Sequence, residues 1–352
     1  MANQEQIAKA LADKIEKLAA GREIKIMHVC GTHEYAITKS GIRSLLPKNV
    51  KVVMGPGCPV CVTPQAEIDA IVEMAERGII ICTYGDLLRV PGTKSSLYDS
   101  VGDIHIVQSI SQAVDIARQN PTKDVVFMAV GFETTAPTTA AVILNDPPAN
   151  FSVLTSHRLV PPAMEWLMEQ GEAKLSGFLL PGHVCTIAGI EEYERFKVPQ
   201  VIAGFEPLEV MYGLYKIVQQ AAEGRAEVEN AYPSVVKREG NVKARHMMAE
   251  VFDVCDIMWR GFPVIPKSGL KLKEKYEQYD ALKKYGIELK ETKVTTGCLC
   301  NELLRGIKEP TDCKLFGKAC TPLKPVGACM VSTEGACRIW YMYGRAAKLV
   351  KQ

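Results

Sequence analysis

Residues 124–137, DVVFMAVGFETTAP, contain the pattern that decides the fold. A short β-branched run, DVVFMAV, is followed by a glycine turn and then by a stretch of helix length. The same order recurs from residue 20 to about residue 220, with helix-length segments such as QAEIDAIVEMAERG between the apolar runs. Unbroken apolar strands that alternate with helices predict an α/β fold with parallel sheets covered on both faces. The runs are EIKIMHV, VKVVM, GIIICTY, DVVFMAV, FSVLTS, SGFLLP and PQVIAGF.

The same patterns divide the chain into expected segments. About 200 residues of alternating strand and helix make two α/β domains or one large one, with a break at the polar stretch ARQNPTKD, 117–124. The tail holds six cysteines within forty residues and has too little apolar periodicity for a core of its own. We expect two parallel-sheet α/β domains, at 1–118 and 119–225, and a small helical and loop-rich domain at 226–352 that binds an iron–sulfur cluster.

The region after residue 225 has a different local pattern. NVKARHMMAEVFDVCDIMW predicts a helix, RGFPVIPKSGL predicts a Pro/Gly connector, and KLKEKYEQYDALKKYG predicts a charged helix with a solvated face. In the tail, metal ligation would supply the stability that a small core lacks.

Composition excludes several classes of protein. The 352 residues are 47% hydrophobic and 23% charged with a net charge of +2, which is typical of a globular protein and gives no nucleic-acid footprint. The first 23 residues predict a charged amphipathic helix rather than a signal peptide, and no apolar run reaches the roughly 18–20 residues of a membrane span. We therefore expect a cytoplasmic protein that binds neither membrane nor nucleic acid.

Twelve cysteines are informative in such a protein. A reducing compartment disfavours structural disulfides, so clustered cysteines there are metal ligands or redox thiols. Cys82 and Cys255 lie in apolar surroundings, and we expect both to be inert buried thiols.

Polar residues follow several of the predicted strands at the point where each strand ends. They are Cys30 after EIKIMHV, Cys58 after VKVVM, Glu133-Thr134-Thr135 after DVVFMAV, His157 after FSVLTS, and His183 with Cys185 after SGFLLP. In open α/β sheets the ligand crevice lies beyond the carboxyl ends of the strands. The sequence therefore predicts that these residues converge on one site.

The CPVC stretch offers several chemistries. Cys58 and Cys61 lie between a strand and a helix that begins near Pro64, where the helix dipole lowers thiol pKa values. Thiolates there favour either metal binding or disulfide exchange. A zinc knuckle is less favoured, because no second CxxC or HxxxH pair accompanies this one.

The CGTHE stretch places Cys30 beside His33 and Glu34. A thiolate near imidazole and carboxylate groups can bind iron, while a lone nucleophile or a buried thiol are the alternatives. For Glu133, Thr134 and Thr135 taken alone, helix capping is the favoured role. A lone histidine such as His183 is often a structural residue.

Four tail cysteines have six, eight and seven residues between them: Cys313, Cys320, Cys329 and Cys337. Four thiolates suit either Zn²⁺ or an iron–sulfur cluster. Structural zinc sites usually pair cysteines as C-x₂₋₄-C, so the wide spacing favours a [4Fe–4S] cluster. Cys298 and Cys300 are spare thiols that could lie near the cluster or replace a ligand.

The motifs CGTHE, GPGCPVCVTP, GFETTAP and PGHVC, followed by a P-x₂-C-x₆-C-x₈-C-x₇-C tail, occur in this order over residues 20 to 345. In this combination the chain closely resembles the HypD family of [NiFe]-hydrogenase maturation proteins. It departs from the family pattern at Cys185, where serine is expected, and at Asn301, where glycine is more usual.

The resemblance implies a scaffold on which the Fe(CN)₂CO fragment of the hydrogenase active site is assembled. It implies that Cys30 holds the iron, that Cys58 and Cys61 form a redox pair close to it, and that the four tail cysteines hold a [4Fe–4S] cluster. It also implies two partners, a small HypC-type chaperone and a HypE-type cyanide donor. His33 and Glu34 are further candidate catalytic residues. Glu133, Thr134, Thr135 and His183 are candidates for the surrounding layer of residues that supports them.

Two other functions remain open at this point. An iron–sulfur-dependent thiol–disulfide oxidoreductase explains the cluster and the CxxC but leaves CGTHE and GFETT without a role. A zinc-stabilised metabolic α/β enzyme explains little beyond the fold. The sequence leaves open whether the protein is an enzyme, where the CO originates, and whether Cys58 and Cys61 are oxidised at rest.

Overall fold

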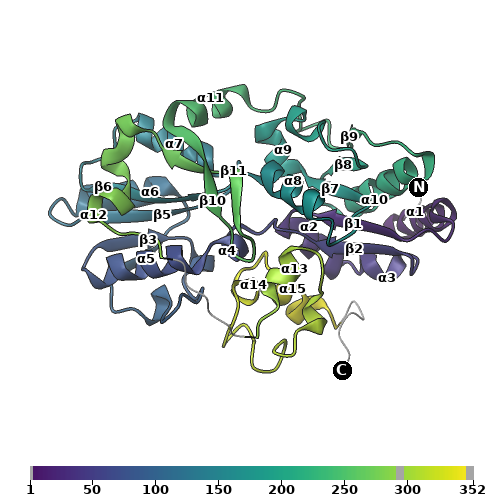
Figure 1. Cartoon of the computed structure of the whole chain (residues 1–352), viewed down its shortest axis with the longest axis horizontal. Helices are drawn as coiled ribbons and strands as arrows, with labels where there is room; N and C mark the ends of the chain where they lie inside the picture. Colours follow the sequence, from purple (N-terminus) through teal and green to yellow (C-terminus); the bar gives the residue numbers. More distant parts are fainter. Residues whose placement is uncertain (1–2, 291–296, 346–352) are drawn as a thin grey trace.

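A computed structural model describes residues 3–290 and 297–345 and contains two parallel sheets, a two-stranded antiparallel ribbon and a C-terminal cysteine-rich tail (Figure 1). Sheet A has the strand order β2-β1-β7-β8-β9, and sheet B has the order β4-β3-β5-β6. All pairings within these two sheets are parallel. The predicted α/β class with two parallel sheets and a loop-rich, cysteine-rich tail is therefore confirmed.

The bounds of the strands match the apolar runs of the sequence. Sheet A contains β1 (Ile24–His28), β2 (Val50–Met54), β7 (Gly177–Pro181), β8 (Gln200–Ala203) and β9 (Val228–Asn230). Sheet B contains β3 (Ile80–Thr83), β4 (Ile104–Ile106), β5 (Val125–Gly131) and β6 (Phe151–His157). Every residue of β5 and β7 is buried, as expected of central strands covered on both faces. Of the four edge strands, β4 and β9 lack such apolar runs and were not predicted.

Helices cover the outer faces of both sheets. Helices α1 (Gln4–Ala19) and α10 (Pro207–Glu223) pack together on sheet A, and α6 (Ile110–Gln119) and α7 (Ala136–Leu144) cover sheet B. The inner faces share one large core with α5 (Gln65–Glu76) and α8 (Val160–Gln170). The other helices that concern the site are α2 (Gly31–Lys39), α3 (Ile42–Leu45), α4 (Pro59–Val62), α9 (Gly182–Ala188), α11 (Val242–Val251), α12 (Ala281–Tyr285), α13 (Cys300–Leu304), α14 (Ala328–Val331) and α15 (Ala336–Tyr343).

The sheets do not divide at residue 118. Sheet A joins β1 and β2 to β7, β8 and β9, while sheet B joins β3 and β4 to β5 and β6. The chain thus begins sheet A, builds sheet B, and then returns to complete sheet A. Apolar runs identify strands but carry no information about which strands pair, because every buried strand presents the same kind of surface.

The segment after α11 differs from the predicted helix. Helix α11 ends at Val251, and the chain continues as β10 (Phe252–Met258), which pairs with β11 (Val264–Leu272) in an antiparallel ribbon. The predicted helix was wrong over FDVCDIM, because these residues pair with β11 in an antiparallel ladder. The predicted Pro/Gly connector is largely β11. The predicted charged helix is two short turns, a 3₁₀ helix at Glu274–Tyr279 and α12, separated by Asp280, whose side chain caps α12.

The tail packs into the junction between the two sheets. In Figure 1 it lies below α4, with sheet B on one side and sheet A on the other. Its buried residues belong to the same core as the inner faces of both sheets, and α15 packs against α2 while α14 packs against α4. Across 3–290 and 297–345, none of the helices has the length and apolar character needed to cross a membrane.

Candidate functional site: the cleft and the cysteine chamber

A cleft of about 840 Å³ lies beyond the carboxyl ends of both sheets. Its walls come from the residues that follow β1, β2, β3, β4, β5 and β7, together with one turn of the tail. This is the position at which open α/β sheets bind ligands. Lining residues that matter below are Cys30, Gly57, Asp86, Thr134, Thr135, His183 and Glu334.

Cys30 stands at the N-cap of α2, directly after β1, and is 8% exposed in the wall of the cleft. Its thiol faces the backbone N–H groups of Thr32 and His33 at the start of the helix. Burial raises the pKa of this thiol to about 11, and the nearby carboxyl of Glu334 contributes to the increase. Without a bound cation the thiol is therefore protonated at neutral pH, and binding a metal ion would release that proton.

Cys58 and Cys61 form a disulfide and are completely buried behind the wall of the cleft. Cys58 caps the four-residue helix α4, which begins at Pro59, so the pair belongs to this short helix and not to α5. The two motifs touch through their backbones, since Gly31 N donates to Gly57 O at 3.2 Å. A Cβ at Gly57 would lie 2.0 Å from the nitrogen of Cys30, so only glycine permits this approach.

Glu34 points away from the cleft and forms the centre of a buried polar cluster. It accepts hydrogen bonds from His28 Nε2 at 2.7 Å, Arg43 Nη2 at 2.7 Å and Trp340 Nε1 at 2.8 Å. Burial alone would raise the pKa of this carboxyl, but Arg43 and His28 outweigh burial and hold the pKa well below its usual value. Because Trp340 belongs to α15, Glu34 joins the tail to α2.

His33 is also completely buried, and the ring of Phe205 lies between it and His183. Its Nε2 lies 2.9 Å from Gly204 O, and burial lowers the pKa of the imidazole to about 3, so the ring is neutral. His33 packs against Phe205 with centroids 4.9 Å apart, and Phe205 stacks on His183 at 3.9 Å. His183 itself lines the cleft, and burial lowers the pKa of its imidazole.

The GFETT turn contributes to the cleft and to helix capping. Thr134 and Thr135 line the cleft, and Thr135 stands at the N-cap of α7 without a side-chain capping bond. Glu133 Oε1 instead accepts a hydrogen bond from Val160 N, the first residue of α8, at 2.9 Å. Its Oε2 has no hydrogen-bond partner within the described chain, and burial raises the pKa of the carboxyl to about 7. Capping does occur here, but it serves α8.

Four other residues that the sequence singled out lie outside the lining of the cleft. His157 is buried, with its Nε2 3.0 Å from Thr139 Oγ1, and Cys185 is buried near Tyr193. Cys82 lies in the core that covers the outer face of sheet B, where burial raises its pKa to about 12. Cys255 is only half-buried on β10, because the strand exposes much of its length.

The tail encloses a second, closed cavity, which we call the cysteine chamber. Apolar side chains such as Leu303, Phe316 and Met330 complete its walls. Its six cysteines are Cys298, Cys300, Cys313, Cys320, Cys329 and Cys337. Over residues 3–290 and 297–345, no three His, Cys, Asp or Glu side chains form a site for a single metal ion. Several cysteine sulfurs around one apolar, buried cavity are nevertheless the donor set that iron–sulfur clusters use.

The sulfurs of the chamber are not equivalent. Cys300 Sγ lies 2.9 Å from Cys329 Sγ, and Cys320 Sγ accepts a hydrogen bond from Val326 N at 3.3 Å. The contact with Cys329 lowers the pKa of Cys300, whereas that same contact and burial raise the pKa of Cys329. Cys300 is therefore the thiol of this pair that ionises first.

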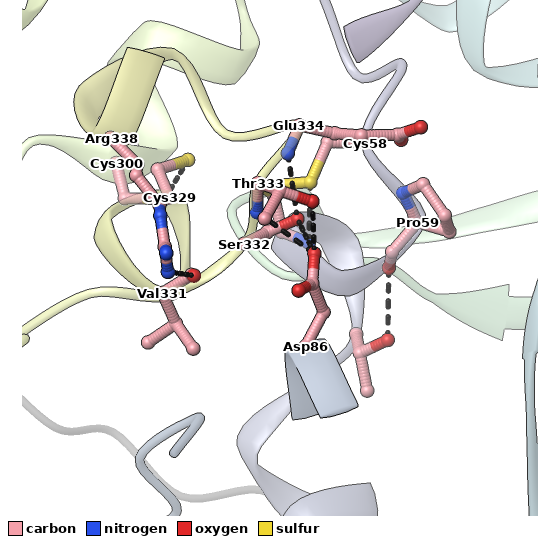
Figure 2. The surroundings of a disulfide bond; sticks show 12 residues. Cys58, Pro59, Asp86, Cys300, Cys329, Val331, Ser332, Thr333, Glu334 and Arg338 are labelled. Atoms are coloured by element: carbon pink, nitrogen blue, oxygen red, sulfur yellow. Dashed lines mark hydrogen bonds between the residues drawn. A yellow bond between two sulfur atoms is a disulfide. The ribbon is translucent and has the colours of Figure 1, made fainter. Parts of the chain in front are cut away.

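One turn of the tail connects the chamber to the cleft. Figure 2 shows residues Ser332–Glu334 beside the disulfide, with Asp86 below them and the Cys300–Cys329 contact on the other side. Asp86 accepts hydrogen bonds from Thr333 N at 2.8 Å, Thr333 Oγ1 at 2.7 Å and Ser332 Oγ at 3.1 Å. Glu334 lies against Gly31, next to Cys30, and burial raises the pKa of its carboxyl to about 7.

Sequence reasoning missed Asp86 and Glu334. Asp86 follows β3 in the stretch TYGD, so the rule used for the other strand ends could have found it. Glu334 lies between Cys329 and Cys337 in the tail, and only the docked tail brings it to Cys30.

Comparison with known proteins agrees with this arrangement. Residues 6–344 match the family model HypD, described as the hydrogenase formation hypA family. The chain is 50% identical to a putative hydrogenase expression/formation protein of Methanocaldococcus jannaschii, over 97% of this chain and 99% of the relative. It is 43% identical to the hydrogenase maturation factor HypD of Azotobacter vinelandii, over 94% and 92% of the two chains, and 38% identical to HypD of Rhodobacter capsulatus, over 97% and 96%. On these matches, the chain belongs to the HypD family.

Proposed function

We propose that this protein is a hydrogenase maturation factor that serves as the scaffold for assembling the Fe(CN)₂CO group of [NiFe]-hydrogenase. The observation that carries the proposal is the position of Cys30. It is a thiol in the wall of an 840 Å³ cleft, backed by the Cys58–Cys61 disulfide, and the tail turn that touches it lies in the sequence between Cys329 and Cys337 of the cysteine chamber. A thiol beside a redox pair and a possible cofactor suits a site where iron is held and its ligands are added.

In this proposal the iron fragment is the cargo, and Cys30 is its protein ligand. Thiolate is a soft ligand that suits low-spin iron carrying cyanide and CO. The proton that Cys30 loses on binding iron needs an acceptor. Glu334 is placed to receive it, since its carboxyl lies close to Cys30 and its pKa of about 7 allows either protonation state.

In the same scheme the disulfide must be reduced before its sulfurs can bind iron. Reducing it to two thiols takes two electrons and two protons, and only the thiols could help to hold iron. Because Cys58 and Cys61 are completely buried behind Gly57, α4 would also have to move for their sulfurs to reach the cargo. In the state described here Cys30 is the only one of the three whose sulfur could bind iron from the cleft.

The residues of the cysteine chamber fit a [4Fe–4S] cluster, which when bound would donate or accept one electron at a time. The set expected from spacing is Cys313, Cys320, Cys329 and Cys337. A second set replaces Cys329 with Cys298. This set leaves Cys329 in its 2.9 Å contact with Cys300, and Cys298 lines the same chamber.

The open side of the cleft is the surface on which we expect the partner proteins to bind. Ile106 and Val235 line it and are 60% and 41% exposed, which provides apolar surface for a protein to cover. We propose that a HypC-type chaperone docks there and that a HypE-type protein delivers cyanide to the same opening.

A second candidate function is an iron–sulfur-dependent thiol–disulfide oxidoreductase, which the observed disulfide favours. The two functions differ in bound diatomic ligands. Protein isolated without oxygen from cells that also express the HypC-type chaperone should show infrared bands of iron-bound CN and CO. The oxidoreductase alone predicts an iron–sulfur protein without those bands.

A further inference from the structure

Arg260 is fixed to the segment that leaves the CPVC helix. It follows Trp259 in the turn between β10 and β11. Its backbone N donates to Val62 O at 2.7 Å, and its side-chain Nε donates to Thr63 O at 2.6 Å. The bond from Nε to Thr63 O fixes one edge of the guanidinium group, and the backbone bond to Val62 O anchors the residue itself.

The same guanidinium group lies near three cysteines of the chamber. Arg260 Nη2 is buried and has no hydrogen-bond partner among the residues that the structure describes. Apart from the burial of Arg260, the strongest influences on its charge are Cys300, Cys329 and Cys298 of the chamber, followed by Glu67. Arg260 also lines a second cleft, of about 790 Å³, together with Cys298 and Cys300. A buried N–H without a partner is costly, so an acceptor at this edge is expected.

The chamber can supply that acceptor once it is loaded. Thiolate ligands and the sulfides of an iron–sulfur cluster accept hydrogen bonds and carry negative charge. A guanidinium group cannot lose its proton under these conditions, so its donor and its charge are both permanent. A free cysteine thiol, by comparison, is a weak acceptor.

We propose that Arg260 is a positioning residue for the cofactor of the cysteine chamber, which donates an Nη2–H hydrogen bond to a ligand or cluster sulfur and raises the reduction potential there. The proposal rests on the proposed [4Fe–4S] cofactor. Reduction adds negative charge to the cluster, and a fixed cation with an N–H donor stabilises the reduced state more than the oxidised one. Because the backbone N of Arg260 is bonded to Val62 O and its guanidinium Nε to Thr63 O, the chamber and the CPVC segment share one support.

The test compares Arg260→Gln with Arg305→Gln in the full-length protein. Arg305 lines the same second cleft, but its Nη1 is bonded to Glu172 at 3.0 Å, so it controls for loss of one positive charge at that cleft. The measurement is the ratio of reduced to oxidised cluster at a fixed potential, followed by electron paramagnetic resonance without oxygen. Arg260→Gln should lower this ratio about tenfold, equal to about 59 mV for one electron, while Arg305→Gln should change it less than twofold.

Each other outcome is decisive. Equal shifts in both variants, or no shift in Arg260→Gln, overturn the proposal while leaving the cofactor assignment intact. If Arg260→Gln binds no cluster, Arg260→Lys is measured: the shorter amine cannot span Thr63 O and the sulfurs, so a ratio equal to that of Arg305→Gln overturns the proposal and a lower ratio supports it. Wild-type protein that binds no cluster overturns both this proposal and the cofactor assignment.

Discussion

The cleft and the cysteine chamber hold thiols in opposite ways. The cleft is open, and it is built from the ends of six strands with a single turn of the tail. The chamber is closed, and its cysteines come from 297–337, a segment without a named strand. An open wall suits a cargo that must arrive, react with partners and leave. A closed, apolar cavity suits a cofactor that stays and is protected from water. In the proposed function, this difference places the site that binds the iron fragment and the site that binds the redox cofactor in separate parts of one chain.

Single cysteine substitutions test whether the chamber binds a cluster. Cys313→Ala should remove the brown colour and most of the iron and sulfide, because Cys313 belongs to both possible ligand sets. Cys298→Ala and Cys329→Ala should differ: one should lose the cluster as Cys313→Ala does, and the other should keep it. Iron and sulfide analysis of protein prepared without oxygen measures this. A colourless wild-type protein with one stoichiometric zinc ion would contradict the cluster assignment.

The redox activity of the disulfide, which lies behind the wall of the cleft, can be tested by thiol labelling. We expect Cys58 and Cys61 to be redox-active, so a thiol reagent should label them several-fold more after reduction than after exposure to air. Cys82, buried in a different core, is the matched control and should react slowly in both states. Mass spectrometry of the labelled peptides gives the extent of labelling. Equal labelling of Cys58 and Cys61 in both states, with the fold intact, would show that the pair has no redox role.

Glu133, which is buried in the turn after β5, makes a smaller, pH-dependent contribution to the free energy of unfolding. Glu133 keeps its proton to about pH 7 in the folded chain and loses it near its ordinary value of 4.5 when unfolded. Its contribution to stability is therefore complete below pH 4.5 and is lost as the pH rises through 7. Between these pH values the free energy of unfolding of the wild type should fall by about 2–3 kcal/mol relative to Glu133→Gln.

Urea denaturation at several pH values measures that difference. The substituted amide keeps an oxygen to accept the Val160 N–H bond, so the helix cap survives. Groups that face Glu133, namely Cys185, Tyr193 and Glu192, are unchanged in the variant. Glu194→Gln, at an exposed ion pair with Arg238, serves as the control and should leave the pH dependence unchanged. Parallel curves for wild type and Glu133→Gln would contradict the assignment.

Strand ends could be predicted from the sequence, whereas the contacts of the tail could not. The rule for parallel sheets identified Cys30, Thr134, Thr135 and His183, all of which line the cleft. It gave no warning that His33 and Glu34, three and four residues after Cys30, turn into the core. Cys30 is the N-cap of α2 and has an extended backbone, so the rule that places residues i, i+3 and i+4 on one helix face does not apply to it. A sequence motif therefore does not predict the direction in which each side chain of one turn points.

Longer-range features were missed for a different reason. Glu334 reaches Cys30 only because Asp86 binds the Ser332–Thr333 turn and Trp340 binds Glu34, and these contacts join residues about 250 to 300 positions apart. The sharing of both sheets across residue 118 has the same cause, since strand pairing depends on tertiary contacts that an apolar run does not encode. Arg260 likewise occurs in a stretch predicted to be a connector, and its partners come from the CPVC segment and the chamber.

The most direct test of the central claim is infrared spectroscopy of Cys30→Ala, isolated without oxygen together with the HypC-type chaperone. The account predicts that this variant keeps its fold and its brown cluster but loses the CN and CO bands that the wild type shows. Cys185→Ala, which removes another buried thiol outside the cleft lining, is the matched control and should retain the bands. Persistence of both sets of bands in Cys30→Ala, at wild-type intensity, would contradict the claim that Cys30 holds the iron.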